Sequence, residues 1–381
     1  MTSVNAPDPA RRPLAGSWMD QEPVRGSAPD PRLLSLSGLE SMRAAWGQRV
    51  PAPPIRYLLG LRPVTVGPAA VTFVMPATPR LRSDAGVFHA GTSTLVADAA
   101  LAGAVQVTLP PGAVVATSDL TVNFLRPVDV DSGRLIARAR PIDVGDSLGL
   151  AGCTIEDGCG RLIAHATTRC YVIRVDTSAA SEDLPELPDV SYDTPHPYQR
   201  PAPPPMAGSW GQRTFVEVVA AKRRGELPLA PCSQLLGCDD PTAQDGVAAL
   251  SLRATPWLAS PAGTVYGGVL AFLADVVLTG AVSTTLRQGT ICSPLDLKVQ
   301  FVRPVRPDGH RLRATATVAH RGRRFATARA EVVGEDGKVA ALAMSSMVIV
   351  EGRSWAALAV ADHAPRDDTW SEPRSADGEA K

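Results

Sequence analysis

The chain has 381 residues, with 38 basic and 38 acidic side chains and a formal net charge of zero. A neutral chain has no bulk field to draw it to nucleic acid or to an anionic membrane, so we expect neither partner. The six cysteines form no Cys-x-x-Cys pair and the six histidines do not cluster. We therefore expect no metal site and no disulfide. No secretory signal is visible at the start, which predicts a soluble, cytoplasmic protein.

One segment of the chain is repeated. Residues 89–105 and 266–282 are two versions of a glycine-opened, almost wholly apolar segment that contains one aspartate. Asp275 lies 177 residues after Asp98 (275 − 98). The same offset joins residues 58–60 to 235–237, 119–128 to 296–305, and Gly145 to Gly322. Solenoid repeats have periods of about 20–50 residues, so this register indicates two copies of one globular domain.

The predicted elements follow the same order in both copies. We expect a helical segment at 38–59 and 215–236, a strand at 71–75 and 248–254, and a long helix at 89–107 and 266–286. Four strands should follow, at 116–125, 135–142, 148–156 and 162–174, and at 293–302, 312–319, 325–333 and 339–350. A helix that is apolar all round, placed among antiparallel strands, predicts an α+β fold in which the sheet wraps the helix.

Composition divides the chain into five parts. We expect a disordered N-terminal tail at 1–35, a first domain at 36–175, a Pro-rich linker at 176–212, a second domain at 213–352 and a C-terminal tail at 353–381. The linker is stiff, partly polyproline in character, and long enough for the two copies to pair side by side.

The aspartates inside the two apolar helices are the candidate catalytic groups. Burying an unpaired carboxylate is costly, so Asp98 and Asp275 at one register suggest chemistry. A carboxylate can activate water or attack a carbonyl, and N–H groups at a helix start can hold the resulting oxyanion. No Gly-x-Ser-x-Gly, P-loop or Gly-x-Gly-x-x-Gly motif points to other chemistry. The alternative is that both aspartates only lock their helices in place.

Residues around the helix starts form a second set of candidates. His89 opens the first helix and can act near an acyl group or bond locally, whereas Tyr266 replaces it in the second copy. Ser83 and Ser260 stand six residues before these positions. Each serine can orient a water molecule or cap a turn, and the turn is the default reading.

Arginines are the candidate phosphate ligands. Arg126 and Arg303 precede proline at the ends of matching strands, where a salt bridge to a nearby loop is the default and phosphate contact the alternative. Arg321, Arg323 and Arg324 form a cationic cluster in the second copy alone. This cluster suits nucleotide phosphates but is nearly as well explained as a solvated hairpin.

Together these motifs resemble those of the PaaI-like hotdog-fold acyl-CoA thioesterases. That family has a His-Gly-Gly helix start, then Ala-Asp, then a strand reading Asp-Leu-x-Val-x-Phe-Leu-Arg-Pro. The first copy has His89-Ala90-Gly91, Ala97-Asp98 and residues 119–127, and the second has Tyr266-Gly267-Gly268, Ala274-Asp275 and residues 296–304. The second copy also has the Gly-Arg-Arg and Asp-Gly-Lys features of the family. The resemblance covers residues 36–174 and 213–350.

The resemblance implies two tandem hotdog domains, each a long central helix wrapped by a curved antiparallel sheet, paired as an intramolecular pseudo-dimer. Active sites would then lie at the interface. Asp98 would face Gly267 and Gly268 of the second copy as general base or nucleophile, with the second residue of the glycine motif as oxyanion donor.

In the other site implied by the resemblance, Asp275 would face His89, Ala90 and Gly91. Coenzyme A would lie across the outer surface with its phosphates near basic residues. The chain departs from the family pattern at four positions: Ser83 and Ser260 stand where asparagine is usual, Ala90 replaces glycine, and Tyr266 replaces histidine.

The sequence therefore predicts an acyl-CoA thioesterase that needs no metal and no cofactor, because coenzyme A is part of the substrate. One alternative is a hotdog hydratase or dehydratase, for which Asp275 facing His89 is the only suitable pair. Another is a catalytically degenerate protein that binds acyl-CoA. Pairing of whole chains into a homo-oligomer is left open.

Overall fold

The computed structural model describes residues 18–27, 30–175, 192–203 and 213–351. The C-terminal tail expected at 353–381, most of the expected linker, and residues 1–17 of the expected N-terminal tail lie outside the described residues.

Each half contains two short helices, a β-hairpin, a long helix and further strands. The first half has α2 (Gly38–Trp46), α3 (Pro54–Leu59), β1 (Arg62–Gly67), β2 (Ala70–Pro76), α4 (Thr92–Gln106), β3 (Ala113–Phe124), β4 (Arg134–Val144), β5 (Leu148–Asp157) and β6 (Leu162–Arg174). The second half has α5 (Phe215–Arg223), α6 (Pro231–Leu236), β7 (Cys238–Gln244), β8 (Val247–Arg253), α7 (Gly267–Thr284), β9 (Thr290–Pro294), β10 (Asp296–Phe301), β11 (Arg311–Arg321), β12 (Phe325–Gly334) and β13 (Val339–Glu351).

All of these strands join one antiparallel sheet in the order β1-β2-β4-β5-β6-β3-β10-β13-β12-β11-β8-β7, with β9 beside β13. The halves meet where β3 pairs with β10. In that pair Leu120 lies opposite Val299, and Val122 lies opposite Leu297. Thr121 and Lys298, which match each other in the repeat, are direct partners, so a pseudo-twofold axis passes through this pair.

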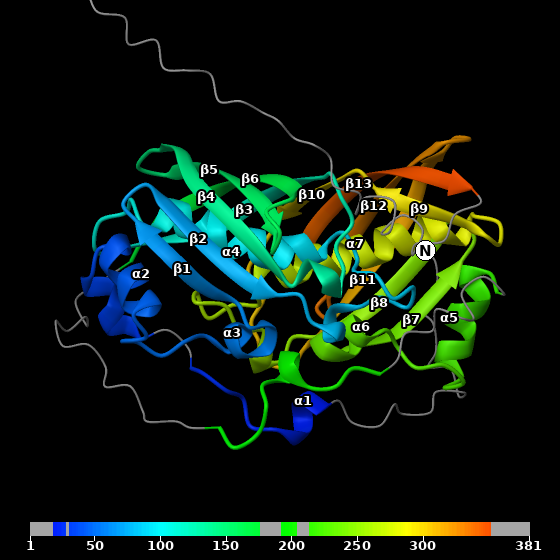
Figure 1. Cartoon of the computed structure of the whole chain (residues 1–381), viewed down its shortest axis with the longest axis horizontal. Coiled ribbons are helices and arrows are strands. Elements are labelled where there is room, and N and C mark those ends of the chain that lie inside the picture. The colour runs from blue at the N-terminus through cyan, green and yellow to red at the C-terminus, as the bar shows by residue number, and fades with distance from the viewer. Residues whose placement is uncertain (1–17, 28–29, 176–191, 204–212, 352–381) are drawn as a thin grey trace, which may run out of the picture.

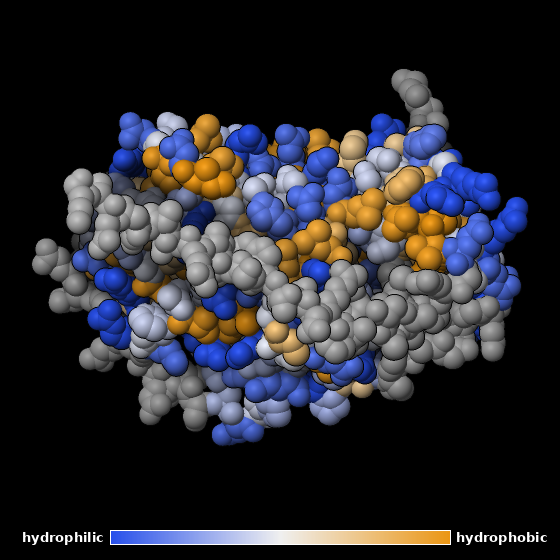
Figure 2. Space-filling view, turned by 45° about the horizontal axis from the view of Figure 1, so that its top comes forward, coloured by the Kyte–Doolittle hydropathy of each residue, from blue (hydrophilic) through white to orange (hydrophobic). Residues whose placement is uncertain are grey.

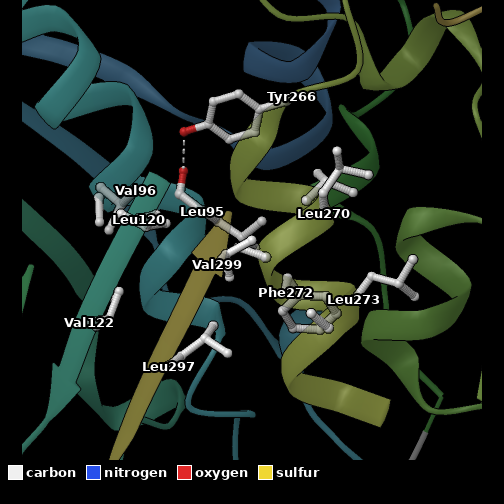
Figure 3. Close-up of a cluster of buried hydrophobic side chains, with 14 of the residues drawn as sticks. Leu95, Val96, Leu120, Val122, Tyr266, Leu270, Phe272, Leu273, Leu297 and Val299 are labelled. Atoms are coloured by element: carbon white, nitrogen blue, oxygen red, sulfur yellow. Dashed lines mark hydrogen bonds between the residues drawn. The ribbon is translucent and has the colours of Figure 1, made fainter. Parts of the chain in front are cut away.

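The two long helices form the inner layer, side by side under the sheet (Figure 1). Figure 3 shows Leu95 and Val96 of α4 and Phe272 of α7 packed with Leu120 and other residues of β3 and β10. These four side chains are completely buried. By length and composition α7 is apolar enough to cross a membrane, but most of it is enclosed within the protein core. The α+β tandem hotdog fold is thereby confirmed.

The elements differ from the predicted ones in three respects. The helical lead of each half is two helices, because prolines start a new helix at Pro54 and Pro231. Strands β1 and β7 were not expected; they are edge strands with half-exposed, weakly patterned side chains. The strand expected at 293–302 is split into β9 and β10, since Pro294 cannot donate a ladder hydrogen bond.

Part of the expected N-terminal tail is ordered, so the prediction of disorder is wrong for the described residues 18–27 and 30–35. The α1 helix (Trp18–Gln21) packs its Trp18 ring against Trp257, with centroids 5.3 Å apart. The Trp18 indole N–H donates to the carbonyl of Gln234 at 2.9 Å. A 3₁₀ helix follows at Pro31–Ser35. Burial of the Met19 side chain helps to offset the conformational entropy that this polar segment loses when it becomes ordered.

The outer face of the sheet has a mixed character. Figure 2 shows apolar patches separated by hydrophilic residues on the face in view. Exposed apolar residues of the sheet include Tyr171, Phe325 and Met344. No partner chain is part of the structure, so association of whole chains stays a prediction.

Candidate active site

Two carboxylates cross the interface between the halves to reach the opposite glycine motif. Asp98 lies in α4, and its Oδ2 accepts a hydrogen bond from the N–H of Gly268 at 2.8 Å. Asp275 lies in α7, and its Oδ2 accepts one from the N–H of Gly91 at 2.8 Å. Both side chains are buried. The expected pairing of each aspartate with the other half's helix start is therefore present.

The glycines are required here because the carboxylates pack directly on them. A Cβ atom at Gly91 would lie 2.6 Å from the Asp275 Cβ, and one at Gly267 would lie 2.9 Å from Oδ2 of Asp98. A side chain at either position therefore requires the neighbouring atoms to shift. Each aspartate also lies at the positive end of a helix dipole, which favours its ionised form.

One N–H beside each carboxylate has no hydrogen-bond partner among the described residues. These are the amides of Ala90 and Gly267, each one residue before the N–H that holds the aspartate. A helix start leaves such donors free by its geometry. The arrangement therefore offers a carboxylate and an adjacent free donor, which are a base and an oxyanion site.

Burial moves the pKa of both carboxyl groups toward neutral pH. Desolvation raises the pKa of Asp98 to about 6, opposed by the hydrogen bonds from Gly268 and Thr117. Desolvation raises the pKa of Asp275 to about 7, opposed only by the Gly91 bond. A general base is most effective when its pKa lies near the working pH, so both groups are suited to that role.

Thr117 is a contact that the sequence reasoning missed. Its hydroxyl donates to Oδ1 of Asp98 at 3.1 Å. The matching residue of the second half is Pro294, and Oδ1 of Asp275 is buried with no partner in the described part of the chain. The repeat matches Thr117 with Pro294, so this difference between the copies was visible in the sequence. The contact of the Thr117 hydroxyl with the Asp98 carboxylate was not.

A cavity of about 240 Å³ lies next to the Asp275 site. His89 and Ala90 at the start of α4 line it on one side, and Val276 and Thr279 of α7 on the other. Its wall also includes an ion pair between Lys222 and Asp84, both of them buried to more than four-fifths. The free N–H of Ala90 thus belongs to a residue of the cavity wall.

The residues around the helix starts have mostly local contacts. The His89 ring lies edge-on to Phe272, with centroids 5.9 Å apart, and burial lowers its pKa to about 4, so the ring is neutral at pH 7. Ser83 donates to the carbonyl of Val87 at 2.6 Å. Ser260 accepts from the N–H of Ala262 at 3.2 Å. Both serines therefore hold turns, although Ser83 also borders the cavity.

Tyr266 occupies the place of His89 in the Asp98 site. Its side chain is buried, and its hydroxyl donates to the carbonyl of Leu95 at 2.8 Å (Figure 3). The ring is therefore held on α4, three residues before Asp98.

The arginines are spread over the surface. Arg126 donates to the carbonyl of Leu162 at 2.7 Å and borders the cavity. Arg303 pairs with Asp336 of the β12–β13 turn at 2.7 Å, which is the expected default. The cluster at 321, 323 and 324 is exposed at the β11–β12 turn. Binding of phosphate by any of these groups stays a prediction. In the described ranges no three His, Cys, Asp or Glu side chains are placed to hold a metal ion.

Both aspartates and the glycines that they contact lie in segments that match a family model. Residues 85–164 and residues 262–341 each match the family model described as the thioesterase superfamily. Two segments of the chain are therefore similar to the thioesterase superfamily. The first matched segment contains Asp98 and Gly91, and the second contains Asp275 and Gly268. No protein of curated function matches the chain in sequence.

Solved structures resemble the chain to different extents. The acyl-CoA thioesterase II TesB2 of Mycobacterium marinum is 16% identical, covers 78% of this chain and 97% of its own, and has a TM-score of 0.46. The tesB protein of Mycobacterium avium subsp. paratuberculosis is 14% identical, with coverage of 78% and 98% and a TM-score of 0.48. A phenylacetic acid degradation-related protein of Ralstonia eutropha JMP134 is 31% identical, with coverage of 36% and 99% and a TM-score of 0.32.

Proposed function

We propose that the chain hydrolyses acyl-CoA to a free carboxylic acid and coenzyme A where a buried aspartate of one half meets the glycine motif of the other. The observation that carries this proposal is the crossed arrangement of the carboxylates. Each buried aspartate, with its pKa near neutrality, is held by one backbone N–H and lies beside a second N–H that has no partner among the described residues.

The reaction follows from these groups. The ionised carboxylate takes a proton from water, and the water oxygen bonds to the thioester carbonyl carbon. The carbonyl oxygen becomes an oxyanion that accepts a hydrogen bond from the N–H of Ala90 or Gly267. As the C=O bond re-forms, the C–S bond breaks, and the protonated aspartate returns its proton to the leaving thiolate. Direct attack by the carboxylate, followed by hydrolysis of the anhydride, is the alternative course.

Coenzyme A thioesters are the proposed substrate class because the matched family model is described as the thioesterase superfamily and the motifs resemble those of acyl-CoA thioesterases. The finer assignment to the PaaI-like group rests on the helix-start and strand motifs, above all His89-Ala90-Gly91 and Tyr266-Gly267-Gly268. Two of the solved relatives that span both halves are named for tesB-type thioesterases.

The hydratase alternative needs Asp275 and His89 to act together. No hydrogen bond joins them within the described residues, and the charges that influence the pKa of His89 are those of Asp84 and Lys222. A neutral ring packed on Phe272 is a poor proton donor for hydration, so hydrolysis is the better supported function.

The test is release of free thiol from a panel of short, medium, long and aromatic acyl-CoAs. It compares the wild type with Asp98→Asn, Asp275→Asn and the double variant, each checked for folding by thermal unfolding. Asparagine keeps an oxygen that can accept the glycine N–H, so the variants should fold. Thiol release by the wild type that disappears in the double variant supports the proposal. Full activity of the double variant would overturn the mechanism, and a 3-hydroxyacyl product formed from crotonyl-CoA without thiol would overturn the reaction.

A further inference from the structure

The two sites differ in the space beside the carboxylate, although their aspartates and glycines match. In the first half the face of α4 at Gly103 is covered: a Cβ atom there would meet Met42 Cε and Phe73 Cε2, each at 3.3 Å. Tyr266 of the second half donates its hydroxyl to Leu95, three residues before Asp98. Side chains of both halves therefore pack on α4 near Asp98.

In the second half the matching positions carry smaller side chains. Met42 is matched by Val219 and Phe73 by Leu250. Val71, which also packs on Gly103, is matched by Ala248. The equivalence holds in the sheet, where Phe73 lies opposite Ala137 and Leu250 opposite Ala314.

These three smaller residues, Val219, Ala248 and Leu250, all line the cavity of about 240 Å³. The cavity therefore lies where these three side chains are smaller than their matches, although Gly280 itself is covered: a Cβ atom there would lie 3.1 Å from Ala248 and 3.2 Å from Phe215. His89 borders the cavity, whereas Tyr266 at the matching position donates its hydroxyl to Leu95.

We propose that the Asp275 site is the acyl-binding site of this chain, and that Ala248 and Leu250 determine this by leaving room for the acyl group. The inference rests on the proposed function and deepens it. A cavity of roughly 150 Å³ is enough for benzene, so about 240 Å³ suits a compact acyl group. Neither Asp98 nor Tyr266 is among the residues that line this cavity.

A separate observation specifies the chemistry of the cavity wall. Thr279 lies one turn after Asp275 on α7 and borders the cavity, while its match in the first half is Ala102. Its hydroxyl oxygen is buried and has no hydrogen-bond partner among the described residues. An acyl group with a hydroxyl or keto oxygen near this position would satisfy that hydroxyl, whereas a purely apolar one leaves it unpaired. The structure thus assigns compact, oxygen-bearing acyl groups to this site.

The first experiment exchanges the two sites' own side chains. Ala248→Val with Leu250→Phe gives the second half the residues of the first, and Val71→Ala with Phe73→Leu is the mirror exchange. We expect the first pair to raise KM for six- to eight-carbon acyl-CoAs at least tenfold, and the mirror exchange to cause no such loss. An unchanged KM in the first pair, or a matching loss in the mirror pair, would overturn the inference. Ala248→Val alone, checked by thermal unfolding, replaces the pair if the double variant does not fold.

Binding separates this inference from the proposed function. A thioether analogue of hexanoyl-CoA cannot be hydrolysed, and its affinity is measured by calorimetry. If the wild type releases no thiol from any acyl-CoA, the proposed function fails. Weaker binding of the analogue to the first pair than to the wild type would still support the cavity as the acyl site, and equal binding would overturn it.

Thr279→Val tests the polar contact, because it removes the hydroxyl and keeps the shape. We expect kcat/KM for 3-hydroxyhexanoyl-CoA to fall about tenfold while that for hexanoyl-CoA stays within twofold, and Thr279→Ser to restore the preference. An equal loss with both substrates, or no loss with either, would overturn the assignment of oxygen-bearing acyl groups.

Discussion

The hydroxyl of Thr117 donates a hydrogen bond to the Asp98 carboxylate at 3.1 Å, and this bond makes the two sites chemically unequal. At the matching place beside Asp275 the chain has Pro294, which has no side-chain donor. Asp98 therefore has two donors and Asp275 has one, in agreement with the higher pKa of Asp275. Both oxygens of Asp98 therefore accept a hydrogen bond, whereas Oδ1 of Asp275 has no partner in the described structure.

Replacing Thr117 by valine should raise the pKa of Asp98 above its present value of about 6, because the hydrogen bond favours the ionised form. Loss of a bond to a charged group should also lower the free energy of unfolding by about 1.5–3 kcal/mol at pH 8. Carboxyl carbon NMR titration and urea unfolding measure the two effects. Thr117→Ser keeps the hydroxyl and is the control. An Asp98 pKa that is the same in the valine variant would contradict the role given to this bond.

Thiol release should rise with pH through about 7, the pKa of Asp275 beside the acyl cavity. The base acts only when ionised, and burial moves its titration there from an ordinary aspartate value of 3.8. The measurement is kcat/KM from pH 4 to pH 9 on one acyl-CoA, with stability recorded at each pH. A rising limb centred near pH 4 would mean that neither buried carboxylate is the base.

The same groups should make stability depend on pH in an unusual direction. The folded protein holds these protons more tightly than the unfolded chain, so the stabilisation is complete below pH 3.8 and is lost as pH rises through about 7. For Asp275 the loss is about 4 kcal/mol at 1.36 kcal/mol per pKa unit. Asp275→Asn should therefore gain stability over the wild type at pH 8 but little at pH 4. Parallel stability curves for the two proteins would refute this.

Gly91→Ala should disrupt the Asp275 site, because the added Cβ would lie 2.6 Å from the Asp275 Cβ. Overpacking of this kind costs about 1–3 kcal/mol, measured by denaturant unfolding. The control is Gly145→Ala, where the nearest atom is 3.8 Å from the added Cβ. If both variants were equally stable, the close packing of carboxylate on glycine would be wrong.

The Lys222–Asp84 ion pair joins the halves beside the cavity, with side-chain exposures of 7% and 14%. Lys222→Met leaves Asp84 without its partner in a poorly hydrated place and should cost about 3–5 kcal/mol of stability. Arg224 and Glu226 form a comparable pair that is exposed, so Arg224→Ala should cause no measurable change. Urea unfolding of the two variants side by side is the test, and equal losses would show that burial does not decide the outcome.

Several features of the site were predictable from the repeat. The match of residues 89–105 with 266–282 predicted the long helices, the duplicated fold and the candidate carboxylates. The family motifs paired each aspartate with the other half's glycines, and the structure places them in hydrogen-bond contact. These features were predictable because they depend on local pattern and on one symmetric pairing.

The sequence by itself determined α4 and α7, the two helices of the inner layer, because a long and almost wholly apolar segment favours a helix that is buried in the core. Only the tertiary structure decided which side chains meet at each carboxylate. Thr117 on a strand contacts Asp98 on a helix through the curvature of the sheet, and no spacing in the chain encodes that contact. The cavity depends in the same way on the summed volumes of Val219 on α5 and of Ala248 and Leu250 on β8, two elements that adjoin one another only after folding.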